Sequence, residues 1–377
     1  MTDEVRDFYK YAVSQGDLKL LDTLLEDYKN FSDEEKNFVF ISTIINSIDT
    51  ATLEHVIALG MDINYVDDKK FTALHYAAAG NSVEIVRYLI DKKFDLEAKT
   101  DAGATPLLIA ANNTTSVEVL DTLIKCGADV DAIDNEKSTI LIEAAKNPVV
   151  DIMNYVLTLK PDLEAKDTGG WTAIMNAANQ NTNELVLDAL REAGANIMAE
   201  TQSGGNLLHL AATNPSVSVI RYLRAFFSST DPDNNGLTPL QLALYASDNP
   251  EVVQLMLESQ KEDVLFHACA NQNPKILYSL IRNGYPANFE SSDLTRPIFW
   301  VARHNTNPEV MEMLIMQGAI LSVKDYSDRT VLHYAAANED PVMYDWLLSH
   351  EELGLDVDAK DAAGNTPEYY RSHPDDF

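Results

Sequence analysis

Cysteine is scarce in this chain of 377 residues, which contains only Cys126 and Cys269. Two cysteines so far apart provide neither a disulfide framework nor a CxxC pair for metal or redox chemistry. We expect both to be small, buried structural thiols, with Cys126 just before a helix-ending glycine and Cys269 in place of a core alanine. The shortage is typical of a reducing compartment, so we expect a cytoplasmic protein.

Long hydrophobic runs are absent as well. No stretch of about 18 apolar residues occurs, which excludes a transmembrane helix and predicts no membrane insertion. The opening residues MTDEVRDFYKYAV lack the basic and then apolar segments of a secretory signal, although export by another route stays open.

Basic side chains are few, with 28 lysines and arginines against 59 acidic residues and a net charge of −31. This balance argues against nucleic acid and anionic membranes, and it favours a protein partner with a basic patch or segment. The alternative interpretation is that the acidic residues only coat a solvated surface.

The motifs of common enzymes and metal sites are missing. The histidines form no HxxxH, HExxH or His/Cys quartet, and the glycines form no GxGxxG, GxxxxGK[ST] or GxSxG. Nothing places two carboxylates in an apolar cleft, which acid–base catalysis would need. We therefore expect no enzyme, with no catalytic residue, no cofactor and no metal.

The sequence does contain a repeated pattern. TALHYAAAGNSVEIVRYLI, residues 72–90, returns as TVLHYAAANEDPVMYDWLL at residues 330–348. We call the first residue of each copy its anchor. Besides Thr72 and Thr330, the anchors are Thr105, Thr139, Thr172, Asn206, Thr238, Asp263, Arg296 and Thr366, with looser matches at Asp7 and Val39. A second motif, such as GADVD at residues 127–131, recurs at the same interval as the anchors, which indicates a repeat array.

An interval near 33 residues, the opening T-P-L-H-x-A-A and the ending G-A-D-V-D together resemble the ankyrin repeat. The resemblance covers nearly the whole chain and implies about eleven to twelve units. It also implies an all-α solenoid of stacked helix-turn-helix units with hairpin connectors. Asn-Pro at the helix–helix turn is similar to bacterial and protist arrays, and it occurs at Asn147, Asn214, Asn249, Asn273 and Asn307.

The residue pattern within one copy independently predicts two helices. The anchor Thr can cap the first helix, and Pro suits its first turn, as in Thr105-Pro106. Leu74 and Ala78 belong to one apolar stripe, and residues 83–90 carry another. One such pair cannot bury its own apolar surface, so stability must come from stacking.

The domain boundaries follow from departures from the pattern. We expect a capping unit at 1–37, a first lobe at 38–260, a second lobe at 261–365, and a half-cap with a tail at 366–377. The interval from Thr238 to Asp263 is short, because residues 258–264 leave no room for the usual connector. This junction is either a lost loop of little consequence or a hinge.

Several recurring residues are better explained by the scaffold. His75, His209 and His333 share one repeat position, and the resemblance implies that they bond backbone near the helix start; repetition argues against a catalytic triad. A second-helix position holds aromatic residues that we expect to be half-buried scaffold: Tyr88, Tyr155, Tyr222 and Trp346.

The resemblance implies a concave groove lined by connector tips and first helices. The tip position before the anchor holds Phe71, Trp171, Leu237 and Arg329. The position four residues after the anchor holds Tyr76, Asn176, Trp300 and Tyr334. The ends of first helices hold Tyr245, Arg303 and His304, and Tyr326 lies on a later tip. Aromatic residues and arginine dominate binding energy at protein interfaces, so we expect these residues to bind a protein. Tyr76, Trp300 and Tyr334 could instead pack between units.

The function predicted from these observations is a non-enzymatic scaffold for protein–protein interaction. A bacterial effector or regulatory inhibitor that binds a host or cognate protein is the first alternative. An enzyme with its active site in the groove is the second.

Overall fold

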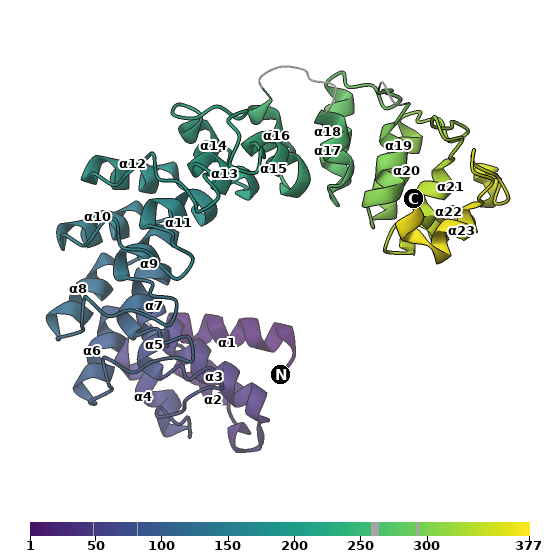
Figure 1. Ribbon diagram of the computed structural model, residues 1–377. Helices are drawn as coiled ribbons and strands as arrows, with labels where there is room; N and C mark the ends of the chain where they lie inside the picture. Colours follow the sequence, from purple (N-terminus) through teal and green to yellow (C-terminus); the bar gives the residue numbers. More distant parts are fainter. Residues whose placement is uncertain (48, 81, 258–263, 292–293) are drawn as a thin grey trace. The chain divides into compact units, whose positions relative to one another are not determined.

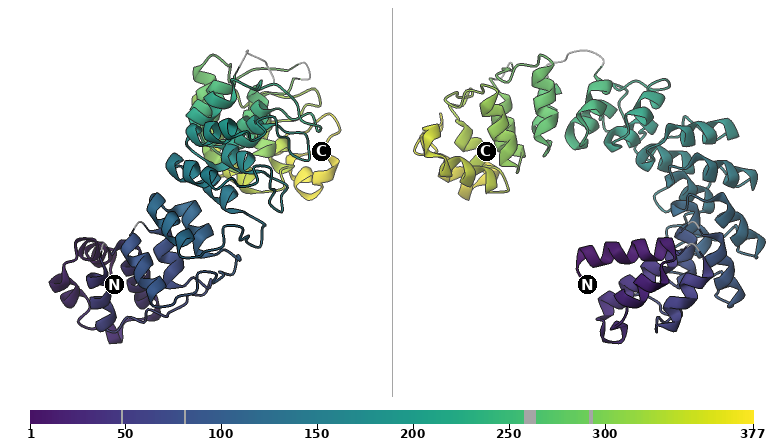
Figure 2. Two further views of the ribbon diagram at one scale, coloured as in Figure 1. Left: turned by 90° about the vertical axis from the view of Figure 1, so that its left-hand side faces the viewer. Right: turned by 180° about the vertical axis from the view of Figure 1, so that it is seen from behind.

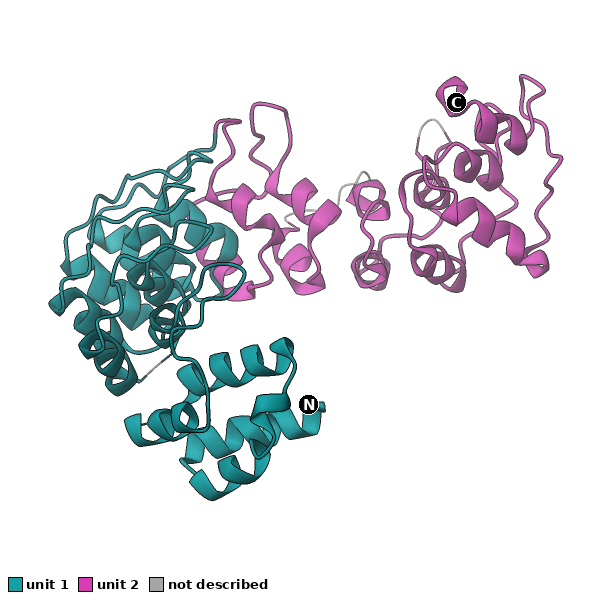
Figure 3. Ribbon diagram, turned by 90° about the horizontal axis from the view of Figure 1, so that it is seen from below, with its two compact units in different colours: residues 1–201 teal, residues 202–377 magenta. Residues whose placement is uncertain are grey.

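The structure is a computed structural model that divides into two compact units, unit 1 (Met1–Thr201) and unit 2 (Gln202–Phe377) (Figure 3). The described residues are 1–47, 49–80, 82–257, 264–291 and 294–377. Residues 258–263, including the anchor Asp263, lie outside them. The expected lobes and the choice between a lost loop and a hinge therefore stay predictions.

Each unit is built from helix pairs that follow one another in chain order (Figures 1 and 2). Unit 1 contains α1 (Asp3–Gln15) and α2 (Leu18–Leu24), η1 (Tyr28–Asn30), α3 (Asp33–Asn46) and α4 (Thr50–Ala58), α5 (Ala73–Ala79) and α6 (Val83–Asp91), α7 (Pro106–Asn113) and α8 (Val117–Lys125), α9 (Ile140–Lys146) and α10 (Val150–Thr158), and α11 (Ala173–Gln180) and α12 (Glu184–Ala193).

Unit 2 continues the same pattern. It contains α13 (Leu207–Leu210) with η2 (Ala211–Thr213) and α14 (Val217–Leu223), α15 (Pro239–Ala246) and α16 (Pro250–Met256), α17 (Val264–Cys269) and α18 (Pro274–Arg282), α19 (Pro297–His304) and α20 (Pro308–Met316), α21 (Val331–Ala336) and α22 (Val342–Ser349), η3 (Glu351–Leu353), α23 (Pro367–Ser372) and η4 (Pro374–Asp376). The described part of the chain is helical without a strand, which confirms the all-α prediction.

Stacking of like helices forms the core. The first helix of each repeat contacts the next first helix, α5 on α7 and α7 on α9, while second helices do the same, α6 on α8. Leu74 and Ala78 are fully buried in this stack, as are Val86 and Leu89 from the second helix. The predicted apolar stripes are therefore confirmed, and the core runs continuously from one repeat to the next within a unit.

The turn between the two helices of a repeat is held by a buried asparagine. The Asn181 Nδ2 group donates to the carbonyl oxygens of Ala145 and Asn147 at 2.7 and 2.8 Å, one repeat earlier. Asn147 in turn donates to Ala111 and Thr114 at 3.1 and 2.9 Å. These bonds satisfy carbonyl groups that helix ends leave without an intrahelical partner.

The five Asn-Pro pairs fall into two different registers of this turn. Asn147 is the C-cap of α9 and belongs to the buried row just described, and Asn214 is likewise the C-cap of η2. Asn249, Asn273 and Asn307 are instead N-caps of α16, α18 and α20, each followed by Pro at the first helical position. The same dipeptide thus ends the first helix of a repeat in two cases and begins the second helix in the other three.

The two cysteines differ in their surroundings. Cys269 is buried, as expected, and burial raises the pKa of its thiol. Cys126 is exposed, so the expectation of a buried thiol is wrong there. Its position explains the difference, because Cys126 is the C-cap of α8 and follows the last buried residue of that helix, Leu123.

Candidate protein-binding surface

The connectors that carry the predicted tip residues are closed by an aspartate five residues before the anchor. In the first connector, Asp67 Oδ1 accepts from the N–H groups of Lys69 and Phe71 at 2.9 and 2.7 Å. The Asp67 N–H donates back to the Phe71 carbonyl at 3.2 Å. Equivalent aspartates are Asp134, Asp167, Asp233, Asp325 and Asp361. We call this arrangement the aspartate clamp.

The clamp fixes all four predicted tip residues through their main chain. Phe71, Trp171, Leu237 and Arg329 each donate their N–H to the clamp aspartate at 2.7 to 2.9 Å. Leu237 is exposed, and the other three side chains are half-buried. The Phe71 ring lies 5.3 Å from the ring of Tyr76, so this tip has an aromatic neighbour that the sequence did not predict.

The residue four positions after the anchor supports the clamp from inside. The Tyr76 hydroxyl donates to Asp67 Oδ2 at 2.5 Å, and the Tyr334 hydroxyl donates to Asp325 Oδ2 at 2.8 Å. Burial and the adjacent Asp67 raise the pKa of Tyr76. The polar ends of both tyrosines are thus committed to the scaffold, while their half-buried rings stay at the surface.

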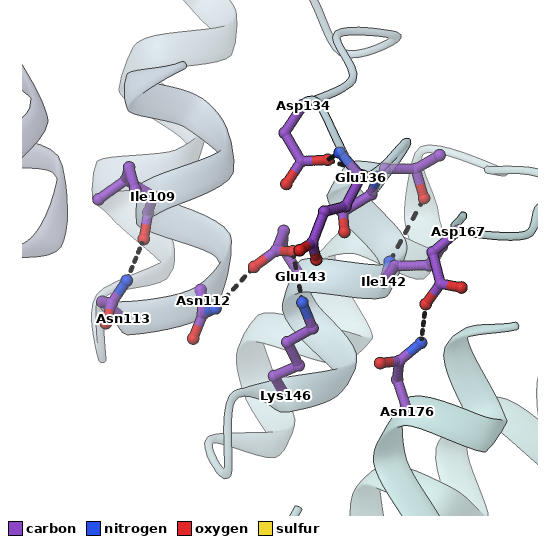
Figure 4. Close-up of polar contacts among 12 residues, drawn as sticks. Ile109, Asn112, Asn113, Asp134, Glu136, Ile142, Glu143, Lys146, Asp167 and Asn176 are labelled. Atoms are coloured by element: carbon purple, nitrogen blue, oxygen red, sulfur yellow. Dashed lines mark hydrogen bonds and ion pairs between the residues drawn. The ribbon is translucent and has the colours of Figure 1, made fainter. Parts of the chain in front are cut away.

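Asn176 occupies the same position but does not reach the surface. Its side chain is 3% exposed, and its Nδ2 group donates to Asp167 Oδ2 at 2.9 Å and to the Thr172 carbonyl at 3.2 Å (Figure 4). This placement differs from the expected partner-facing role. The reason is that the amide side chain is short and donates its hydrogen bond to the clamp aspartate Asp167.

The recurring histidine joins consecutive repeats. His75 Nδ1 accepts from the Thr72 N–H at 3.1 Å, and Nε2–H donates to the Ala104 carbonyl in the next connector at 3.1 Å. His209 and His333 repeat the arrangement. These bonds confirm the structural interpretation. They need a neutral ring, with one nitrogen accepting and the other donating.

An ionic contact on the first helices of unit 1 was missed by the sequence analysis. Glu143, four residues after its anchor and 8% exposed, accepts from Asn112 Nδ2 at 2.6 Å and from Lys146 Nζ at 2.7 Å (Figure 4). An acidic residue inside the apolar segment TILIEAA was the available signal. Because both carboxylate oxygens are engaged, Glu143 is a paired structural group.

Four predicted residues meet in unit 2 around a cavity of about 260 Å³. They are Trp300, Arg303, His304 and Tyr334, and we call them the end cluster. Phe377 also lines this cavity: its ring lies 4.7 Å from the Tyr334 ring and 4.2 Å from the Arg329 guanidinium. The contribution of Phe377 could not be predicted, because the tail lies beyond the repeat pattern.

The remaining predicted residues lie outside the end cluster. Tyr245 and His267 Nδ1 share a hydrogen bond of 3.2 Å between neighbouring first helices. Tyr326 is 70% exposed on its connector. In the described residues, His, Cys, Asp and Glu side chains form no group of three or more that could hold a metal ion. Within that same part of the chain, no helix combines the length and apolarity needed to cross a membrane.

Comparison with known proteins identifies the family. A family model described as "Ankyrin repeats (3 copies)" matches residues 9–134, 107–201, 174–264 and 265–361. The matches cover most of the chain. The eleven to twelve units expected from the sequence are consistent with the helix pairs described above. The chain belongs to the ankyrin-repeat family, for which a protein-binding role is typical.

The curated relatives are longer than this chain. The palmitoyltransferase AKR1 of Lachancea kluyveri is 29% identical over 50% of this chain and 27% of its own length. The ankyrin repeat and KH domain-containing protein mask-1 of Caenorhabditis elegans is 26% identical over 70% of this chain and 9% of its own. Inversin of Canis lupus familiaris is 30% identical over 45% of this chain and 17% of its own length. The similarity therefore concerns only a part of each relative.

Proposed function

We propose that the chain is a non-enzymatic scaffold that binds a protein partner through its connector tips and first helices. The observation that carries this proposal is the end cluster, in which an indole, a guanidinium and a phenol ring surround one cavity of about 260 Å³. Large aromatic side chains and arginine supply most of the binding energy at protein interfaces. No metal or cofactor is needed for such a role.

The rigidity of the connectors supports the same function. The aspartate clamp holds the main chain of Phe71, Trp171 and Arg329 in place before a partner arrives. A backbone that is already ordered loses less conformational entropy on binding, which strengthens the complex. The clamped tips therefore offer further contacts for a partner besides the end cluster.

The charge of the chain points to the class of partner. A net charge of −31 attracts a protein with a basic patch or segment and repels nucleic acid. We propose a cytoplasmic protein of this kind as the partner. In this scheme, long-range attraction brings the basic protein close, and the aromatic residues then supply the short-range contacts.

Substitution of the two predicted tryptophans tests the proposal. Trp171→Ala and Trp300→Ala, singly and together, should weaken binding of a partner captured from native lysate by about tenfold or more, because each is an interface anchor. Trp346→Ala is the matched control, since Trp346 is half-buried on the second helix α22. Circular dichroism should show equal helical content for all variants. Unchanged affinity in the double variant would refute the assignment.

A further inference from the structure

A second cavity, of about 910 Å³, lies in unit 1 between the start of α3 and the connector after α4. We call it the amino-terminal cavity. Its volume is typical of a pocket that holds a small ligand or a few residues of a peptide. None of the residues predicted from the sequence to bind a partner lines it.

The cavity exists because the first long connector has a neighbour on one side only. Successive connectors are joined tip to tip by main-chain hydrogen bonds, from Asp101 N–H to Lys69 O at 2.9 Å and from Asn135 N–H to Ala102 O at 2.9 Å. The segment before the first long connector, residues 25–32, is shorter and folds into η1. The connector at residues 59–72 therefore leaves space against η1 and α3.

Aromatic rings form the walls of this space. Tyr28 of η1 and Phe40 of α3 are 7% and 2% exposed, and Tyr65 of the connector is 36% exposed. The rings of Phe40 and Tyr65 meet edge to face at 5.2 Å. Such walls can pack against the aliphatic part of a side chain, and their ring faces attract a cation.

Carboxylates line the cavity together with the aromatic rings. Asp33 comes from α3, while Asp62 and Asp68 come from the connector. Burial raises the pKa of Tyr65, and the charges of Asp68 and Asp33 add to that effect, which places both carboxylates within electrostatic reach of the ring. Lys29 and Lys36 also line the cavity, but the acidic residues outnumber them.

Asn37 of α3 adds a polar side chain to the same lining. Aromatic walls beside carboxylates suit an organic cation with an apolar stem, because the stem packs on the rings while the charged end meets the carboxylates.

We propose that the amino-terminal cavity binds an arginine or lysine side chain of a partner segment. The cationic group lies between Asp33 and Asp62, and the aliphatic stem lies on Phe40 and Tyr65. Arginine fits better than lysine, because its planar group stacks on tyrosine and bonds a carboxylate through two donors. The site rests on the proposed function, since it gives the basic partner a specific contact.

Titration with blocked tripeptides tests this site without a partner protein. The chain has 10 methionines, and Met61 lines the cavity, so methionine-methyl NMR reports binding there. Acetyl-Gly-Arg-Gly-amide should shift the Met61 signal saturably, with the lysine peptide weaker and the norleucine peptide about tenfold weaker than arginine. The exposed Met198 and Met316 should not move. A norleucine peptide that binds equally well, or no shift at Met61, would overturn the proposal.

Substitutions then separate the cavity from the general charge of the chain. Asp33→Asn with Asp62→Asn should weaken the arginine peptide about tenfold, because two charges at the cation are lost. Asp91→Asn with Asp131→Asn removes two exposed carboxylates elsewhere in unit 1 and should change affinity by less than about twofold. Equal losses in the two double variants would contradict the site.

A third variant addresses the aromatic wall. Tyr65→Leu keeps an apolar side chain but removes the ring, and it should weaken the arginine peptide severalfold while leaving the norleucine peptide unchanged. Failure of the peptides to bind would refute the cavity but leave partner capture through Trp171 and Trp300 intact. Loss of capture in those tryptophan variants would not affect peptide binding.

Discussion

At the scale of the residue, one histidine position shows how neighbouring repeats are connected. His75 bonds its own helix start through Nδ1 and the next connector through Nε2. The chain itself contains a substitute at this position, because Gln241 Oε1 accepts from the Thr238 N–H at 3.0 Å. Glutamine can therefore make the first of these contacts without carrying a titratable group.

This position predicts a pH dependence of stability. Burial lowers the pKa of His75 and His333 from the ordinary 6.5, so the unfolded chain binds protons more readily than the folded one. Their contribution to stability is complete above about pH 6.5 and is lost as the pH falls through the folded pKa values. His75→Gln with His333→Gln should flatten the melting temperature between pH 7.5 and 5.5. Melts followed by circular dichroism check this, and parallel pH profiles of the double variant and the unaltered chain would contradict it.

Residues of the candidate site were predictable in position but not in role. The interval of the repeat placed Tyr76 and Asn176 at one equivalent position. Whether a side chain there turns outward depends on its length, because a phenol reaches Asp67 with its ring still at the surface, whereas the amide of Asn176 reaches Asp167 only when buried. That distinction arises from the connector geometry, which the sequence does not state directly.

At the scale of the element, the buried asparagine row is the polar counterpart of the apolar stack. Each member satisfies two carbonyl groups one repeat away, as Asn181 does for Ala145 and Asn147. Buried carbonyl groups without a donor are costly, so each asparagine links the stability of two repeats.

Removal of one asparagine should therefore destabilise unit 1 strongly. Asn181→Ala leaves the carbonyls of Ala145 and Asn147 without their donor and should cost about 2 to 4 kcal/mol. Gln180→Ala is the control, because Gln180 is exposed one residue earlier and should cost less than about 0.5 kcal/mol. Urea unfolding measures both. Equal midpoints for the two variants would show that the row contributes little.

Elements were predicted well where periodicity decides them and poorly where it does not. The apolar stripes of residues 73–90 gave the helices of that repeat, because burial of one face requires that spacing. The two registers of Asn-Pro were not predictable, since Asn147-Pro148 and Asn249-Pro250 are the same dipeptide. Only the position of each asparagine relative to the buried row separates them.

At the scale of the whole molecule, the excess of acidic residues dominates long-range interactions. A net charge of −31 over 377 residues acts on a partner well before contact. Salt weakens such attraction, because the screening length falls from about 10 Å at 0.1 M ionic strength to about 3 Å at 1 M.

Partner capture should therefore depend on salt. We expect the proposed basic partner to be retained at about 0.1 M ionic strength and largely released at about 1 M, because screening removes the attraction while apolar contacts remain. Parallel washes of immobilised chain at the two concentrations measure this, with the Trp171→Ala and Trp300→Ala double variant as the low-affinity reference. Retention that is equal at both concentrations would contradict recognition guided by charge.

The aspartate clamp has a consequence for how such a surface can change over time. It holds the residue before the anchor by its amide and carbonyl groups, so the clamp itself does not depend on the identity of that side chain. Within this one chain the clamp holds phenylalanine, serine, tryptophan, leucine, arginine and asparagine at this position. Every residue except proline has the main-chain N–H that the clamp requires. Substitutions at this position can therefore change the surface that a partner meets while the clamp is kept.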